Sequence, residues 1–274
     1  MKKLNALFLA SAGMLLSLAA HAYDFSHQLT EDGVEYGFHQ GDDNGPLLIT
    51  ITTDIKESMT DVYSPVGSLL AQRGYSVASI DVTCHGKDLL KHEKYGLDCW
   101  RARADSSQTN IFDDYIERLK SVIADIASKN RADTSKITIL GVSRGGYLAM
   151  RSAAELQEVA IVIALAPVTD LFKLREFEGT KAPQSLYSLK PFYPEIATKH
   201  LFLQINNNDE RVGTSQALSL VKEVAEAGGD NQVDITAIIT PRKGHSTSEH
   251  EMAANWAISE RTSASIEKQL EPPK

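Results

Sequence analysis

The sequence lacks an excess of basic residues, and it has few cysteines. It contains 28 Lys and Arg residues and 36 Asp and Glu residues, which gives a formal net charge of -8. Because binding to nucleic-acid phosphates requires a basic surface, we expect no nucleic-acid partner. The composition, 42% hydrophobic and 23% charged residues, is that of a globular protein and excludes a disordered or collagen-like chain.

After residue 22 the sequence also lacks internal repeats, low-complexity segments and Pro- or Gly-rich linkers. A single domain over residues 23–274 therefore accounts for the rest of the chain, and its length allows a substantial core. The apolar run at residues 159–166 is too short to span a membrane.

The first 22 residues have the pattern of a signal peptide. Lys2 and Lys3 precede an apolar run over residues 4–20, and Ala20-His21-Ala22 places small residues where a signal peptidase cleaves. We expect cleavage before Tyr23 and an exported protein, periplasmic or secreted, without membrane contact once the signal is removed. The alternative is a retained membrane anchor. Because no Cys follows the cleavage site, lipidation is not indicated.

Two cysteines, Cys84 and Cys99, lie in one polar stretch. In an oxidising compartment such a pair forms a disulfide, and closing the loop between them is worth about 3 kcal/mol in the chain-entropy model. One alternative is a metal site formed with His85 and His92, although the spacing matches no common zinc pattern. The other alternative is two free thiols. We expect a disulfide and no metal ion.

Short apolar runs alternate with amphipathic stretches along the whole chain. This alternation predicts an α/β fold: a mostly parallel central sheet with helices on both faces, in three layers. Functional groups in such sheets collect at the carboxyl ends of the strands. The expected strands cover residues 47–51, 75–82, 137–140, 159–166, 201–205 and 233–239, and the expected helices cover 64–74, 110 onward, 147–156, 215–227 and 250 onward.

A G-x-S-x-G motif stands at one of these strand ends. Gly141, Ser143 and Gly145 follow the strand at residues 137–140 and precede a helix, which is where a nucleophile elbow is found. Gly146 would let that helix approach the sheet. The alternative is a glycine-rich turn with a capping serine. A phosphate-binding loop is disfavoured because no G-x-x-x-x-G-K-[ST] spacing is present.

A serine nucleophile needs a base, and the base needs an orienting acid. Asp209 and His245 follow two later strands and occur in the order Ser, acid, His that this fold requires. We therefore predict a triad of Ser143, His245 and Asp209. Asp170 is the alternative acid, and His250 is the alternative base.

These motifs, in this order, resemble the α/β-hydrolase superfamily, and within it the prolyl-oligopeptidase-like and dienelactone-hydrolase-like members. The segments that carry the resemblance are Gly141–Gly146, Asp209–Val212, Gly244-His245 and Asp81–Gly86, the last with Cys84 where the family usually has Gly. The resemblance implies hydrolysis of an ester, amide or peptide through an acyl-serine intermediate, without a cofactor.

The chain departs from that family where one donor of the oxyanion hole is expected. The family usually carries His-Gly after the strand before its first helix, whereas here Thr52-Thr53-Asp54 follows residues 47–51. A backbone N–H donates whatever its side chain, so we expect the N–H groups of Thr53 or Asp54 and of Arg144 to form the hole. Losing one such donor costs about 3 kcal/mol of transition-state stabilisation.

The sequence indicates the type of reaction more clearly than it indicates the substrate. Phe172 and Phe177, in the insertion over residues 167–200, and Trp100 are candidate pocket residues; the alternative is that these aromatics pack the insertion onto the domain. Residues 23–46 are too few for the β-propeller that precedes the hydrolase domain of prolyl-oligopeptidase-type peptidases. We therefore expect an esterase acting on a small ester, with a peptidase acting on short peptides, or a non-catalytic binding protein, as alternatives.

Overall fold

The computed structural model describes residues 23–231 and 233–270. Within these residues one sheet of eight strands has the order β1-β2-β4-β3-β5-β6-β7-β8. The strands from β4 to β8 in this order pair in parallel, and β1 and β2 join antiparallel at one edge. The strands are β1 (Ser26–Leu29), β2 (Glu35–His39), β3 (Pro46–Ile51), β4 (Ser76–Ser79), β5 (Asp133–Val142), β6 (Val159–Leu165), β7 (His200–Asn208) and β8 (Ile235–Lys243).

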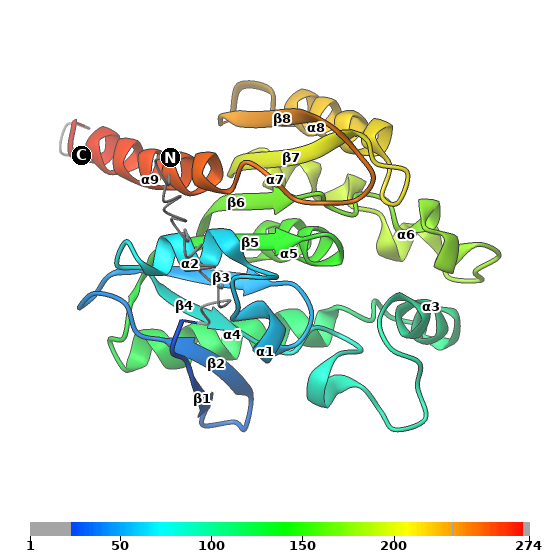
Figure 1. The fold of residues 1–274 in the computed structure, drawn as a ribbon, viewed down its shortest axis with the longest axis horizontal. Helices are drawn as coiled ribbons and strands as arrows, with labels where there is room; N and C mark the ends of the chain where they lie inside the picture. The colour runs from blue at the N-terminus through cyan, green and yellow to red at the C-terminus, as the bar shows by residue number, and fades with distance from the viewer. Residues whose placement is uncertain (1–22, 232, 271–274) are drawn as a thin grey trace, which may run out of the picture.

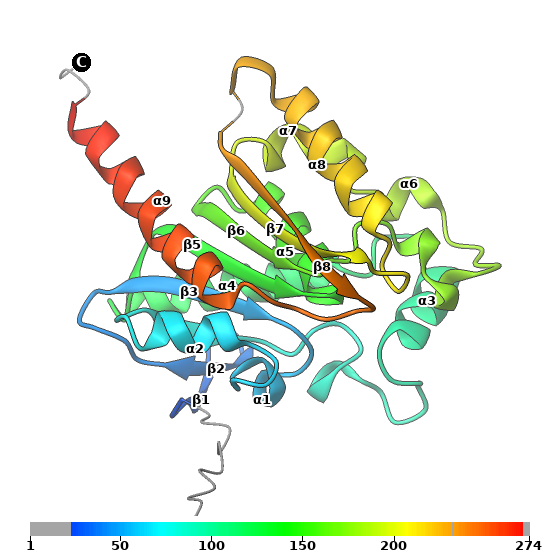
Figure 2. The same ribbon diagram turned by 45° about the horizontal axis from the view of Figure 1, so that its top comes forward.

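Helices cover both faces of this sheet (Figure 1). In Figure 2, α2 and α9 lie in front of the sheet and α4 and α5 lie behind it. Two hydrophobic clusters, one on each face, fill the spaces between the layers. The helices are α1 (Ile55–Ser58), α2 (Pro65–Ala71), α3 (Leu97–Ser106), α4 (Asp113–Ser128), α5 (Arg144–Glu155), α6 (Gln184–Tyr187), α7 (Tyr193–Ile196), α8 (Thr214–Gly228) and α9 (His250–Leu270).

The middle of the sheet follows from its sequence. β6 is an uninterrupted apolar run, Val159–Leu165, and all but one of its residues are buried. A strand without polar alternation can be buried on both faces, and β6 pairs in parallel with β5 on one side and β7 on the other. The three strands therefore end together at one edge, with Ser143 directly after β5 and Asp209 directly after β7.

The predicted fold class, a three-layer α/β-hydrolase arrangement, is confirmed. The expected strands and helices are present, with shifted ends: β5 extends over residues 133–142 instead of 137–140, and α4 begins at Asp113 instead of near Asn110. The hairpin of β1 and β2 and the helix α3 were not predicted.

The expected signal peptide, residues 1–22, lies outside the described residues. Within the part of the chain that is described, no helix is both long and apolar enough to cross a bilayer.

Candidate active site

Ser143 lies on a sharp turn between β5 and α5. Its backbone has φ 54° and ψ -115°, in the left-handed region that L-residues rarely adopt. The turn is tight because Gly145 approaches β3 so closely that a Cβ there would lie 1.8 Å from the carbonyl oxygen of Ile51. The Ser143 N–H is bonded to the carbonyl oxygen of Leu165 at 3.0 Å, which ties the turn to the end of β6. This is the geometry of a nucleophile elbow.

The structure brings Ser143, His245 and Asp209 together. Nε2 of His245 lies 2.9 Å from the Ser143 hydroxyl oxygen, and Nδ1 lies 2.8 Å from Oδ2 of Asp209. Because a carboxylate only accepts hydrogen bonds, Nδ1 carries the proton and Nε2 presents its lone pair to the serine hydroxyl. The arrangement is the one in which an imidazole can take the serine proton.

Asp209 is oriented by its own loop. Its side chain is fully buried, and its Oδ1 accepts the backbone N–H groups of Arg211 at 2.9 Å and Val212 at 3.2 Å. These two bonds leave Oδ2 for the imidazole, so the carboxylate has a partner for each oxygen. A buried carboxylate satisfied in this way is held in one orientation.

The alternative acid and base lie in other contacts. Asp170 caps a short 3-10 helix, η2 (Leu171–Lys173), by accepting the Phe172 N–H at 2.9 Å. His250, at the start of α9, lies 2.9 Å from the Thr247 hydroxyl through Nε2. Burial lowers the pKa of the His250 imidazole. Neither residue is hydrogen-bonded to Ser143, His245 or Asp209 in the described part of the chain.

Asn206, which the sequence analysis did not single out, holds the loop that carries His245. Its Nδ2 donates to the carbonyl oxygens of Gly244 at 2.8 Å and Ser246 at 3.2 Å, the residues on either side of the histidine. Its Oδ1 accepts the Thr240 hydroxyl at 2.6 Å. Asn206 is completely buried, so these bonds form without competition from water. An asparagine inside a buried strand is the only sequence signal that could have drawn attention to it.

The segment expected to complete the oxyanion hole follows β3 directly. The Thr53 N–H points toward the Ser58 hydroxyl at a distance of 3.4 Å, a long hydrogen bond. The Asp54 side chain caps α1 by accepting the Glu57 N–H at 2.8 Å. The carboxylate of Asp54 is thus engaged with its own helix. The oxyanion roles of the Thr53 and Arg144 N–H groups stay predictions.

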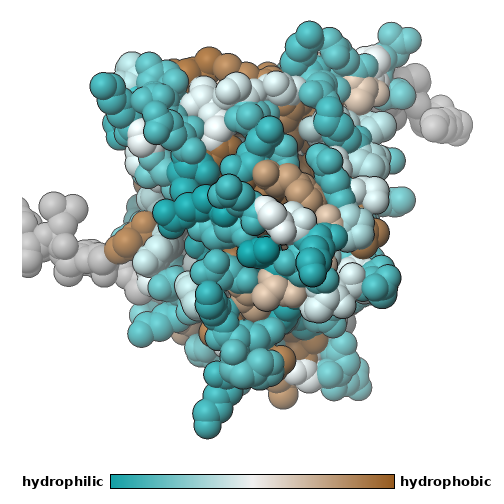
Figure 3. Space-filling view, turned by 90° about the vertical axis from the view of Figure 1, so that its right-hand side faces the viewer, coloured by the Kyte–Doolittle hydropathy of each residue, from teal (hydrophilic) through white to brown (hydrophobic). Residues whose placement is uncertain are grey.

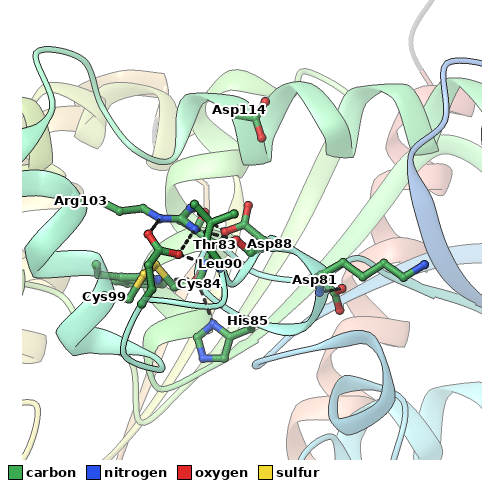
Figure 4. Close-up of polar contacts among 12 residues, drawn as sticks. Asp81, Thr83, Cys84, His85, Asp88, Leu90, Cys99, Arg103 and Asp114 are labelled. Atoms are coloured by element: carbon green, nitrogen blue, oxygen red, sulfur yellow. Dashed lines mark hydrogen bonds and ion pairs between the residues drawn. A yellow bond between two sulfur atoms is a disulfide. The ribbon is translucent and has the colours of Figure 1, made fainter.

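Cys84 and Cys99 are joined by a disulfide between the loop after β4 and helix α3. Neither sulfur is therefore available as a thiolate to ligate a metal ion. Charged side chains hold the same loop in place: Arg103 is paired with Asp88 at 2.7 Å and with Glu93 at 2.7 Å, as Figure 4 shows for the cluster around the disulfide. Asp88 also accepts the backbone N–H of Cys84 at 2.6 Å.

This loop reaches the elbow turn through a histidine that contacts Arg144. His85, fully buried, accepts a hydrogen bond from Nη1 of Arg144 at 2.8 Å and donates through Nδ1 to the Thr83 carbonyl oxygen at 2.9 Å. Burial and, to a lesser extent, the nearby Arg144 charge lower the pKa of the His85 imidazole to about 4, against the opposing effect of the Thr83 bond. Since Arg144 follows Ser143 directly, the disulfide-closed loop is in contact with the elbow.

The expectation of a pocket lined by Trp100 and Phe177 is not met, because both belong to the core. Trp100 is completely buried, donates through Nε1 to the Thr83 carbonyl oxygen at 2.7 Å and packs edge-on against Phe112. Phe177 is 2% exposed. Phe172 is half-buried and lines a cavity of about 230 Å³ between the insertion and α8. From the sequence alone, an aromatic residue that lines a pocket cannot be distinguished from one that packs in the core. Here Trp100 and Phe177 pack in the core, and Phe172 lines a cavity.

The carboxyl ends of the strands point to the right in Figure 1, and Figure 3 views the molecule from that side. Hydrophilic residues cover most of this face, and hydrophobic residues are visible in its middle. The His245 side chain is 29% exposed, so the candidate site is open to solvent.

The model of the prolyl oligopeptidase family matches residues 63–262, most of the chain, including Ser143, Asp209 and His245. The chain belongs to the prolyl oligopeptidase family. This membership supports the assignment of the chain to the serine hydrolases and leaves esterase and peptidase activity open.

Solved structures similar to this family member include both kinds of enzyme. The esterase Pf2001 from Pyrococcus furiosus is 20% identical, with a TM-score of 0.56 and coverage of 90% of this chain and 92% of that one. The Pyrococcus horikoshii acylaminoacyl peptidase is 14% identical, with a TM-score of 0.64 and coverage of 88% and 41%. At these identities the likeness concerns the fold.

Among curated proteins, the chain is 30% identical to the hydrolase LUC6 from Fusarium over 134 residues. The match covers 48% of this prolyl oligopeptidase family member and 29% of that relative, so the chain spans less than a third of the length of the curated relative it matches.

Proposed function

We propose that this protein is an exported serine hydrolase that cleaves an ester or amide bond through an acyl-serine intermediate. Ser143 is the nucleophile, His245 the general base and Asp209 the residue that orients the base. The observation that carries the proposal is the chain of two hydrogen bonds, 2.9 Å and 2.8 Å, which joins the three side chains on an elbow turn.

In the first half of the reaction, the Ser143 oxygen attacks the scissile carbonyl while Nε2 of His245 takes the hydroxyl proton. The carbonyl oxygen becomes an oxyanion, which the N–H groups of Arg144 and Thr53 stabilise. His245, now protonated and paired with the Asp209 carboxylate, gives the proton to the leaving alkoxide or amine. The carbon–leaving-group bond breaks, and the acyl group remains on Ser143.

In the second half, water replaces the leaving group. Nε2 of His245 takes a proton from the water, whose oxygen attacks the acyl carbonyl, and the same two N–H groups hold the second oxyanion. The proton returns from His245 to the Ser143 oxygen as the acid product leaves. No cofactor takes part in either half.

Export and the domain boundaries belong to the same proposal. Residues 1–22 act as the signal peptide, and residues 23–274 form one hydrolase domain. The disulfide between Cys84 and Cys99 supports export, because such bonds persist in oxidising compartments. The acidic net charge of -8 disfavours nucleic acid as a partner.

A peptidase acting on short peptides is the second candidate, favoured by the family that the chain matches. Rates on a panel of p-nitrophenyl esters against a panel of aminoacyl-naphthylamides decide between the two. The esterase proposal predicts turnover of the esters and little cleavage of the amides. The reverse ranking would select the peptidase.

Covalent labelling tests the mechanism that both candidates share. A fluorophosphonate should label the protein at Ser143, and Ser143→Ala should abolish both labelling and turnover, while Ser135→Ala, an exposed serine at the start of β5, serves as the control. Labelling at another residue, or no labelling, would leave only a non-catalytic binding protein.

Two matched variants test which carboxylate orients His245. Asp209→Asn removes the carboxylate that Nδ1 of His245 faces, and it should reduce kcat by about 10⁴-fold, as loss of the orienting acid does in a serine triad. Asp170→Asn alters a helix cap and should leave kcat close to that of the wild type. The opposite ranking would reassign the acid to Asp170.

A further inference from the structure

The Arg144 guanidinium is a charge beside the nucleophile without a charged partner. It is half-buried and makes one hydrogen bond, from Nη1 to Nε2 of His85 at 2.8 Å. Within residues 23–231 and 233–270, no carboxylate oxygen lies within 4.0 Å of its nitrogen atoms. A guanidinium has five N–H donors, so most of its donors are not used by the protein.

The one partner of this guanidinium is neutral. Nδ1 of His85 donates to the Thr83 carbonyl oxygen, so Nε2 has no proton and can accept from Arg144. Burial holds the pKa of this imidazole at about 4, which keeps it uncharged at neutral pH. The Tyr95 ring packs edge-on against the imidazole at 4.6 Å between centroids. His85 therefore positions the guanidinium without neutralising it.

The carboxylates whose charges act on Arg144 do not contact it. The Thr53 hydroxyl donates to Glu57, and Asp54 caps α1. Oε1 of Glu176, on the insertion, accepts from Arg211 at 2.9 Å and from Arg175 at 3.1 Å, whereas its buried Oε2 has no hydrogen-bond partner among the described residues. Glu57 and Glu176 are close enough to act on the charge of Arg144, yet neither contacts it. A half-buried charge that lacks a protein partner is costly unless a ligand supplies one.

We propose that Arg144 selects substrates that carry a carboxylate close to the scissile bond, so that this protein hydrolyses anionic esters or amides. The proposal rests on the proposed function, because it takes Ser143 as the nucleophile. Arg144 is the next residue in the chain after Ser143, and its side chain reaches from the elbow to His85. Its planar fork of donors matches the two oxygens of a carboxylate. His85, on the disulfide-closed loop, is a positioning residue for it.

Two pairs of substrates that differ only in charge test the proposal. The first pair is mono-p-nitrophenyl glutarate and its methyl ester, with the carboxylate on the acyl side. The second is 4-acetoxybenzoate and its methyl ester, with the carboxylate on the leaving group. The readout is the ratio of kcat/KM for the anionic member to that for its methyl ester. The wild type should favour the anion in at least one pair, and Arg144→Gln should reduce that ratio about 10- to 100-fold.

Three further measurements make the result decisive. Arg144→Lys keeps the charge and should retain part of the preference, which also covers the case that Arg144→Gln fails to fold. Arg73→Gln removes an exposed arginine that pairs with Glu251 and should leave the ratio unchanged. Fluorophosphonate labelling of Ser143 reports on the nucleophile independently. Labelled protein without a preference for either anion, or with a ratio unaffected by Arg144→Gln, would overturn the proposal, whereas absent labelling would overturn the proposed function instead.

Discussion

The pKa of His85 makes the stability of this protein depend on pH in a calculable way. Burial lowers it from 6.5 to about 4 in the folded protein, so the native imidazole stays neutral while that of the unfolded chain takes up a proton as the pH falls through 6.5. The stabilisation linked to His85 is therefore present above pH 6.5 and is lost between pH 6.5 and 4. At 1.36 kcal/mol for each pKa unit, the loss is about 2.5 kcal/mol between pH 7.5 and 4.5.

Urea unfolding at pH 7.5, 6.0 and 4.5, followed by circular dichroism with the disulfide intact, measures this loss. His85→Gln keeps an acceptor and a donor but does not titrate, so its free energy of unfolding should fall by about 2.5 kcal/mol less than that of the wild type over this range. His92→Gln removes an exposed histidine of the same loop and is the control. If the wild type and His85→Gln lose the same free energy of unfolding over this range, the pKa of His85 is not lowered by burial. The account of His85 as a neutral partner that positions Arg144 would then be wrong.

Three other changes probe the site and its scaffold. Asn206→Asp replaces the amide that donates to the residues on both sides of His245, and kcat should fall about tenfold or more with KM nearly unchanged. Asn207→Asp, at an exposed position near the end of β7, should not alter kcat. Non-reducing mass spectrometry of exported protein should find Cys84 linked to Cys99; two alkylatable thiols would contradict this. Gly145→Ala should lower the free energy of unfolding by about 3 kcal/mol in urea titrations, because the added Cβ would overlap the Ile51 carbonyl oxygen of β3. An unchanged urea midpoint would mean that β3 can shift to make room for the methyl group.

The centre of the fold and the pairing of the site residues follow from sequence because few arrangements satisfy the constraints. An uninterrupted apolar strand such as β6 must lie inside a sheet covered on both faces. Parallel strands end at the same edge, so a serine after β5 and an acid after β7 lie at that edge wherever the intervening helices pack. Asp170 and Asp209 both satisfy the order Ser, acid, His. The sequence favoured Asp209 because it and His245 follow successive strands, and in the structure Asp209 lies against His245.

What the sequence did not predict depends on contacts between distant segments. β1 is an edge strand whose residues are mostly exposed, so its hydrophobic pattern is weak. Helix α3 interleaves charged residues with its buried ones, among them Trp100, and therefore looks like a polar loop. The role of Asn206 requires knowing that the loop after β8 returns over β7, which no local pattern indicates. These features are determined by tertiary packing, so the periodicity of the sequence does not predict them.

One departure of this chain from the pattern of its family, Cys84, is linked through the next residue to the arginine beside Ser143. Cys84 has φ 66°, in the left-handed region that favours the glycine usual at this position, so a cysteine there costs about 1 kcal/mol of backbone strain. The disulfide that this cysteine forms is worth about 3 kcal/mol in the chain-entropy model and so outweighs that cost. It also fixes the next residue, His85, whose neutral ring holds Arg144 beside Ser143. Cys84, although its backbone conformation is unfavourable, is thus connected through its disulfide and His85 to Arg144, the charge that we propose selects the substrate. The hydrogen bonds between Ser143, His245 and Asp209 do not involve this loop.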